Sequence, residues 1–159
     1  MSKDEYAREV EELYPRLHAF ALLHMGSEAL AQDAVSEAVY RGLVSIRKLR
    51  EPAFFRTWLV RILINECNNI WRKRKREIPY EAIPDTPAYE KAYDALPLRE
   101  AISRLPKELK EVIVLRYYAG FSLAETADCL NLPQGTAATR ARRALKLLKL
   151  ELEEKHEQE

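Results

Sequence analysis

Lys107–Leu152 reads KELKEVIVLRYYAGFSLAETADCLNLPQGTAATRARRALKLLKLEL, and this stretch predicts a helix-turn-helix. Helical spacing of apolar residues occurs in three consecutive segments: Glu108–Tyr118, Ser122–Leu130 and Gly135–Leu152. Gly120 separates the first two segments. Glycine adopts a positive φ there more readily than any residue with a Cβ atom would. Ser122 is followed three residues later by Glu125, a capping-box pattern that predicts a helix start. Pro133 ends this second helix, because a proline disfavours a helical residue before it.

The third segment has two distinct sides. Small and apolar residues fall on one side at helical spacing: Ala137, Ala141, Ala144, Leu145, Leu148 and Leu152. Polar and basic residues fall on the other: Thr136, Thr139, Arg140, Arg142, Arg143 and Lys146. A helix of this kind, placed after a tight turn, suits the major groove of duplex DNA. The alternative is a helical hairpin whose basic side is only solvated.

Composition favours an all-α protein that contains one domain or two small ones. The chain has 159 residues, only four glycines and few β-type alternations. Its formal net charge of +1 hides a segregation of charge. Acids gather at both ends of the chain, whereas bases gather in Arg72–Arg76 and Arg140–Lys149. Two separate basic patches indicate two contacts with a polyanion.

Several function classes are disfavoured. Cys67 and Cys129 are isolated, which argues against a zinc site or a disulfide and predicts buried free thiols, with no metal or cofactor. His18 and His24 lie six residues apart, so we expect surface or hydrogen-bonded core histidines. Neither paired carboxylates nor a Ser/His/Asp set occurs at a workable spacing, so no enzyme is expected. No signal peptide or apolar run near the ~20 residues of a membrane helix is found, which predicts a cytoplasmic protein without membrane insertion.

The N-terminal half begins with two predicted helices. The first is Glu5–Met25, in which Pro15 predicts a break or kink. The second is Glu28–Arg47, capped by Ser27. Its core stripe comprises Ala31, Ala34, Val35, Ala38, Val39, Gly42 and Ile46, and its opposite side carries Asp33, Glu37, Tyr40 and Val44. An acidic face with an apolar centre is typical of docking to a basic helix of another protein, although single apolar residues also occur on ordinary exposed faces.

A third predicted helix, Phe54–Arg72, follows the loop Leu49–Ala53. Its apolar side comprises Phe55, Leu59, Ile62, Leu63 and Ile70, with Glu66 among them as a candidate for an internal ion pair. Its other side carries Phe54, Trp58, Arg61, Asn65, Asn68 and Arg72, with Asn69 near the edge. Aromatic rings stack on unpaired bases, amides read base edges and arginines bind phosphates, so this side suits a single strand. The alternative for Phe54 and Trp58 is packing against a neighbouring helix.

An unbroken basic run, RKRKR, closes this helix. Phosphate contact is predicted for Arg72, Lys73, Arg74 and Arg76. The proline-containing segment after it reads as a linker between two helical domains. The resulting division is residues 1–76, a linker at 77–95, and a helix-turn-helix domain at 96–159.

Taken together, the two halves resemble the extracytoplasmic-function (ECF) group of bacterial sigma factors, the small promoter-recognition subunits of RNA polymerase. Ala31–Val39 (AQDAVSEAV) is similar to the helix with which the family binds core polymerase. Phe55–Leu59 (FRTWL), with the basic run, is similar to the helix that melts promoters and reads the minus-ten element. Leu105–Thr136 is similar to the domain that reads the minus-thirty-five element.

The resemblance implies partners and residue roles. Core RNA polymerase would be bound by Asp33, Glu37, Tyr40 and Arg41. Flipped bases of the melted strand would be captured by the loop Leu49–Ala53 and by the helix that carries Arg61, Asn65 and Asn69. Duplex promoter DNA would be read by Thr136, Thr139, Arg140 and Arg143. The family also implies an anti-sigma factor as a partner.

Departures from the family pattern leave the promoter sequence open. The recognition helix reads GTAATRARRAL where the family typically has GTVKSRLHRAR, and Asn69 stands where an Asp is usual. One rival hypothesis is a helix-turn-helix regulator that binds duplex DNA without polymerase, which leaves FRTWL and the acidic face unexplained. Another is a helical adaptor without a nucleic-acid role, which predicts no salt-sensitive DNA binding.

Overall fold

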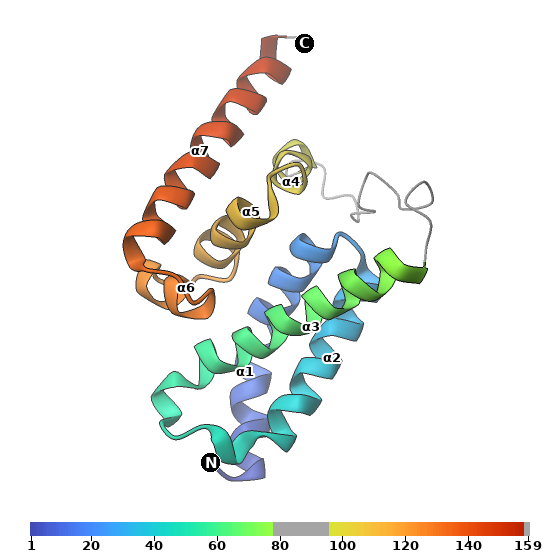
Figure 1. Cartoon of the computed structure of the whole chain (residues 1–159), viewed down its shortest axis with the longest axis vertical. Coiled ribbons are helices and arrows are strands. Elements are labelled where there is room, and N and C mark those ends of the chain that lie inside the picture. Colours follow the sequence, from blue (N-terminus) through green and yellow to red (C-terminus); the bar gives the residue numbers. More distant parts are fainter. Residues whose placement is uncertain (78–95, 158–159) are drawn as a thin grey trace.

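The computed structural model describes residues 1–77 and 96–157, and these contain helices and no strand (Figure 1). The predicted all-α fold is confirmed. An N-terminal bundle comprises α1 (Lys3–Met25), α2 (Glu28–Val44) and α3 (Phe55–Glu77), with the 3₁₀ turns η1 (Ile46–Lys48) and η2 (Pro52–Phe54). A C-terminal unit comprises α4 (Leu96–Ser103), α5 (Lys107–Ile113), η4 (Val114–Tyr118), α6 (Leu123–Cys129) and α7 (Gln134–Glu157). The predicted linker lies outside the described residues, apart from Glu77.

Helix α1 is continuous from Lys3 to Met25, so of the break or kink predicted at Pro15 the break does not occur. The proline removes one helical hydrogen bond, but buried Leu13 and Leu17 hold the helix to the core on either side of it. The helix begins at Lys3 because Ser2 and Glu5 form a capping box, with bonds of 2.7 Å and 3.2 Å.

Helix α2 packs against α1 and α3 through a stripe of mostly small residues. Ser27 caps it as predicted, accepting from the Leu30 N–H at 3.3 Å. It ends at Val44, before the predicted Arg47, and a 3₁₀ turn follows. At Gly42 an added Cβ would lie 2.4 Å from the Tyr6 hydroxyl, which donates to the Val39 carbonyl at 2.6 Å. The small stripe therefore sets how closely α1 and α3 approach α2.

Helix α3 is buried on two sides. It runs five residues beyond the predicted Arg72 and includes the basic run. Phe55, Leu59 and Leu63 are buried as predicted. Val60 and Ile64 are buried as well, which the sequence reading missed, and Cys67 is buried as predicted. The additional burial arises because α3 packs against α6 as well as against α1 and α2.

The C-terminal unit contains the predicted helix-turn-helix. Gly120 has φ of 74°, and Ser122 and Glu125 form the predicted capping box with bonds of 3.0 Å and 3.1 Å. The segment predicted as one helix over Glu108–Tyr118 instead changes to a π-helical turn at Val114. A π turn adds one residue to the ring closed by each hydrogen bond, which sequence period alone does not reveal.

Helix α7 carries the recognition segment and packs on α4, α5 and α6. Its buried side comprises Ala137, Ala141, Ala144 and Leu148. Leu145, predicted on that side, is 43% exposed, so its assignment is wrong. An ion pair between Arg104 and Glu151 ties the far part of α7 to the end of α4.

Candidate nucleic-acid and polymerase interfaces

A groove between α2 and α3 brings together two sets of residues that the sequence predicted separately. Its volume is about 630 Å³. From α2 it is lined by Glu37, Tyr40, Arg41 and Val44, and from α3 by Ile62, Asn65, Glu66 and Asn69. Tyr40 is 64% exposed and Val44 is 67% exposed, so the apolar part of the groove is open to a partner. Asp33 is exposed one turn before Glu37 on the same helix.

Arg41 organises one wall of this groove. Its Nε lies 2.9 Å from Glu66 Oε1 and 3.0 Å from Glu37 Oε1. Glu66 is only 6% exposed, and burial raises the pKa of its carboxyl, while the Arg41 charge opposes that rise. This is the internal ion pair expected for Glu66. Arg41 therefore joins α2 to α3 and holds the Glu37 carboxylate at the groove.

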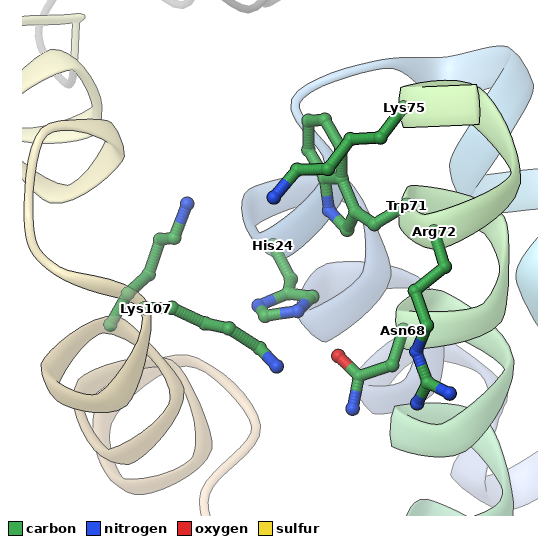
Figure 2. A pocket seen from close by; sticks show the side chains of 7 residues that line it. His24, Asn68, Trp71, Arg72, Lys75 and Lys107 are labelled. Carbon is green, nitrogen blue, oxygen red and sulfur yellow. The ribbon is translucent and has the colours of Figure 1, made fainter. Parts of the chain in front are cut away.

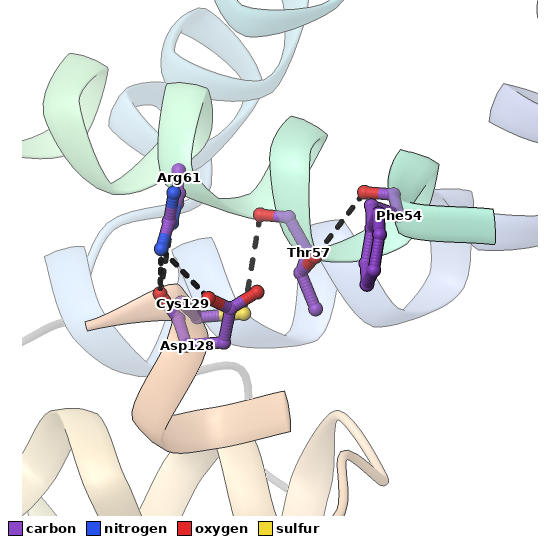
Figure 3. A network of polar contacts seen from close by, with 5 residues as sticks. All are labelled: Phe54, Thr57, Arg61, Asp128 and Cys129. Atoms are coloured by element: carbon purple, nitrogen blue, oxygen red, sulfur yellow. Dashed lines mark hydrogen bonds and ion pairs between the residues drawn. The ribbon is translucent and has the colours of Figure 1, made fainter. Parts of the chain in front are cut away.

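The opposite edge of α3 contacts the helix-turn-helix (Figure 3). Arg61 donates from Nε to the Asp128 carbonyl at 2.8 Å and from Nη2 to the Asp128 carboxylate at 2.8 Å. Next to it, the buried Cys129 thiol lies 4.0 Å from the Thr57 carbonyl. On the same side of α3, the Arg56 guanidinium lies 5.2 Å from the centre of the Phe121 ring. These contacts hold the N-terminal bundle against the C-terminal unit.

The single DNA-facing side predicted for α3 is thus divided between two surroundings. Asn65 and Asn69 line the groove with α2, whereas Arg61 contacts the C-terminal unit and Asn68 faces a pocket beside it. Sequence reasoning left two apolar residues of α3 unassigned, Val60 and Ile64, which a purely solvated or DNA-bound side would not require.

The remaining predicted residues of this half differ in exposure. Phe54 is 60% exposed and open to a partner. Trp58 is half-buried, and its ring lies 6.1 Å from that of Phe55 on the same helix. Arg72 and Lys73 are exposed, and Arg74 is half-buried. The side chain of Arg76 lies outside the described residues.

The first three turns of α7 present a basic surface. Thr139, Arg142, Arg143 and Lys146 are exposed, and Thr136 and Arg140 are half-buried. The Thr139 hydroxyl donates to the Gly135 carbonyl at 3.0 Å and accepts from Arg142 at 3.5 Å. These side chains are therefore displayed together on the side of α7 away from its packed alanines, as a groove-reading helix requires.

The described histidines and cysteines are not clustered with one another. Among the described residues there is no group of three or more side chains suited to hold a metal ion. His18 bonds Glu28 at 2.7 Å, as a surface histidine. His24 is 1% exposed and neither ring nitrogen has a hydrogen-bond partner in the part of the chain that the structure describes, so the expectation of a hydrogen-bonded core histidine is wrong there. Cys67 and Cys129 are free and buried, as predicted.

In the described parts of the chain, we find no helix with the length and apolarity needed to cross a bilayer.

Known proteins match both halves. The family model for Sigma-70 region 2 matches residues 10–77, and that for Sigma-70 region 4 matches residues 95–148. RNA polymerase sigma factor SigV of Bacillus subtilis is 31% identical over 137 residues, covering 84% of this chain and 81% of its own. ECF RNA polymerase sigma factor SigM of Mycobacterium tuberculosis is 30% identical over 148 residues, covering 89% of this chain and 74% of its own.

Solved structures agree. The sigma factor RpoE of Bartonella quintana, in complex with the anti-sigma factor NepR, superposes with a TM-score of 0.79 at 26% identity and covers 94% of this chain and 97% of its own. CnrH, in complex with the cytosolic domain of CnrY, superposes with a TM-score of 0.76 at 21% identity and covers 96% of this chain and 90% of its own. This second match shows that the fold is shared.

The all-α fold and the exposed basic surface of α7 together define the class of protein: a helix-turn-helix DNA-binding protein with an additional helical bundle. With these matches, the chain belongs to the ECF sigma factors of RNA polymerase. It is a transcription initiation factor that binds polymerase and directs it to promoters.

Proposed function

We propose that the chain docks on core polymerase through Asp33, Glu37 and Tyr40, with Arg41 holding the Glu37 carboxylate in place. The observation that carries this proposal is the groove between α2 and α3, where Glu37 lies beside the exposed Tyr40 and Val44. Acidic and aromatic side chains around an apolar centre complement a basic helix of a partner. The chain acts in the cytoplasm and is not an enzyme, because polymerase performs the chemistry.

Docking is tested by replacing Glu37 and Tyr40 together with alanine. We expect loss of co-elution with core polymerase in gel filtration, without loss of helix content. The matched control replaces Gln32 and Ser36, two exposed residues of α2 that do not line the groove. Co-elution of the double variant at the level of the control would show that the docking surface lies elsewhere.

We also propose that residues 1–76 and residues 96–159, joined by a linker at 77–95, act as separate DNA-contacting parts. Asn65 and Asn69 capture unpaired bases beside the groove, and the basic run contacts phosphates. Contacts of this kind exist only after strand separation, so they offset the cost of unstacking. Phe54, exposed at the start of α3, offers a ring on which a base stacks.

The C-terminal unit reads duplex DNA through Thr136, Thr139, Arg140 and Arg143, with Arg142 and Lys146 on phosphates. Replacing exposed Arg143 with alanine should weaken binding of the holoenzyme to the upstream element by about 1–3 kcal/mol. Footprinting on promoters identified by run-off transcription measures this. Lys149→Gln, a charge removal farther along α7, serves as the control. Equal losses from both variants would assign Arg143 a non-specific role.

The contact between Arg61 and Asp128 marks the observed arrangement as a closed state. In this state the Nε and Nη2 groups of Arg61 are bound to Asp128 and not to a melted strand. We infer that binding to polymerase separates the two parts, and that an anti-sigma factor holds the free chain closed. Support for that partner comes from the Bartonella quintana relative, whose structure is a complex with an anti-sigma factor.

A further inference from the structure

A basic pocket lies between the N-terminal bundle and the C-terminal unit (Figure 2). We call it the interdomain pocket. Its volume is about 350 Å³. It is lined by His24 of α1, by Asn68, Trp71, Arg72 and Lys75 of α3, and by Lys107 and Lys110 of α5. Four of these side chains are cationic and none is acidic, so the pocket has a strongly positive lining.

Two of the lining side chains are buried polar groups without partners. His24 is 1% exposed, and neither Nδ1 nor Nε2 has a hydrogen-bond partner among the described residues. The buried Oδ1 of Asn68 also has none. Buried polar groups are nearly always paired, because each unpaired one costs about 1–3 kcal/mol. Both side chains face the pocket, so a ligand there would supply the missing hydrogen bonds.

The cations of the pocket are poorly neutralised. Lys107 lies 3.7 Å from the Glu111 carboxylate. Among the side chains that the structure describes, those of residues 1–75 and 97–154, Arg72, Lys75 and Lys110 form no ion pair. Lys110 is half-buried, and burial lowers the pKa of its amine, which Glu111 only partly opposes. Gathering positive charges in a partly desolvated site is unfavourable unless an anion joins them.

We propose that the interdomain pocket binds a small phosphate-bearing anion, held by Arg72, Lys75 and Lys110. A guanidinium group binds two phosphate oxygens at once through parallel hydrogen bonds, and an ammonium group binds phosphate as a point charge. The neutral imidazole of His24 donates its single N–H to an oxygen. Rotating the Asn68 amide by half a turn presents its NH₂ in place of the unpaired Oδ1. The pocket is large enough for a small molecule and too small for a DNA duplex.

Binding at this place couples to the arrangement of the two parts. The ligand would contact α3 on one side and α5 on the other, and only the closed state brings these helices together. A ligand that binds one state more tightly shifts the population toward it. The anion therefore favours the closed state in which Arg61 is bound to Asp128. This effect does not depend on the residues proposed to contact DNA and polymerase.

The test is calorimetric titration of the full chain with inorganic pyrophosphate at low salt, with orthophosphate, ATP and GTP as further arms. Lys75→Gln removes an exposed cation and should leave the fold intact, and Lys110→Gln removes the half-buried one. We expect each to weaken pyrophosphate binding about tenfold, the loss typical of a charged hydrogen bond. Lys149→Gln, an equal charge change on α7, should change it less than about twofold.

Comparing the titrations with pyrophosphate, ATP and GTP shows which kind of phosphate compound the pocket binds. Tighter binding of ATP or GTP than of pyrophosphate assigns the site to nucleotides, with the base against Trp71. Equal binding assigns it to the polyphosphate group itself. The proposal is overturned by absence of binding at millimolar pyrophosphate, or by equal losses from Lys75→Gln and Lys149→Gln. It is also overturned if the pocket variants weaken single-stranded DNA binding and leave pyrophosphate binding unchanged.

Discussion

At the scale of single residues, Gly42 sets the spacing of the N-terminal bundle. An alanine in a helix interior is normally more stable than a glycine by about 1 kcal/mol. At Gly42 the added methyl group would meet the Tyr6 hydroxyl at 2.4 Å and Leu59 at 2.9 Å. We therefore expect Gly42→Ala to lower the free energy of unfolding by about 1–3 kcal/mol, measured by urea denaturation. Ser36→Ala, on the exposed side of α2, should change it little, and a stabilising Gly42→Ala would contradict the close approach.

His24 should make stability depend on pH. Burial, with Lys110 and Lys107 nearby, lowers the pKa of His24 from 6.5 to about 3. Between these values the unfolded chain binds a proton that the folded chain does not. The free energy of unfolding should therefore fall with decreasing pH by at most about 1.4 kcal/mol per pH unit from this residue.

Urea denaturation between pH 7 and 5 measures this effect. His24→Leu, which cannot titrate, should reduce the slope relative to the wild type, and His18→Gln, at a half-buried position of the same helix, should retain it. Equal slopes in the wild type and His24→Leu would show that His24 is protonated in the folded chain.

At the scale of elements, the contact between α3 and α6 controls access to Arg61. Asp128→Ala removes the carboxylate but leaves the carbonyl, which still accepts from Arg61. Exposed ion pairs contribute about 0.2–1 kcal/mol, so the closed state should lose about 1.5- to 5-fold in population. If binding to core polymerase requires opening, its affinity should rise by that factor, measured by fluorescence anisotropy. Glu153→Ala, an exposed acid on α7, is the control, and unchanged affinity of Asp128→Ala would separate docking from opening.

At the scale of the whole molecule, the buried thiols report separation of the two parts. Burial raises the pKa of Cys129 from 9.0 to about 12, and the thiol packs under α3 at Thr57. Since the thiolate is the reactive form, alkylation at neutral pH should be suppressed on the order of 10³-fold in the closed state. Core polymerase should accelerate labelling of Cys129, followed by peptide mass spectrometry, and pyrophosphate should slow it. An unchanged rate on the polymerase would mean that α3 and α6 stay together.

The sequence by itself determined the helices, the turn and the caps, and with them the family. Ser122 with Glu125, and Gly120 at its positive φ, act within a few residues, so local order in the chain is sufficient to predict them. Tertiary structure alone decided the second buried side of α3, the π turn at Val114, the burial of His24 and the partner of Arg61, which is 67 residues away. Helical period shows that a side chain lies on a face, but it does not show which distant segment covers that face. Pairing across such distances depends on how whole helices pack, and it placed a predicted DNA contact against the helix-turn-helix.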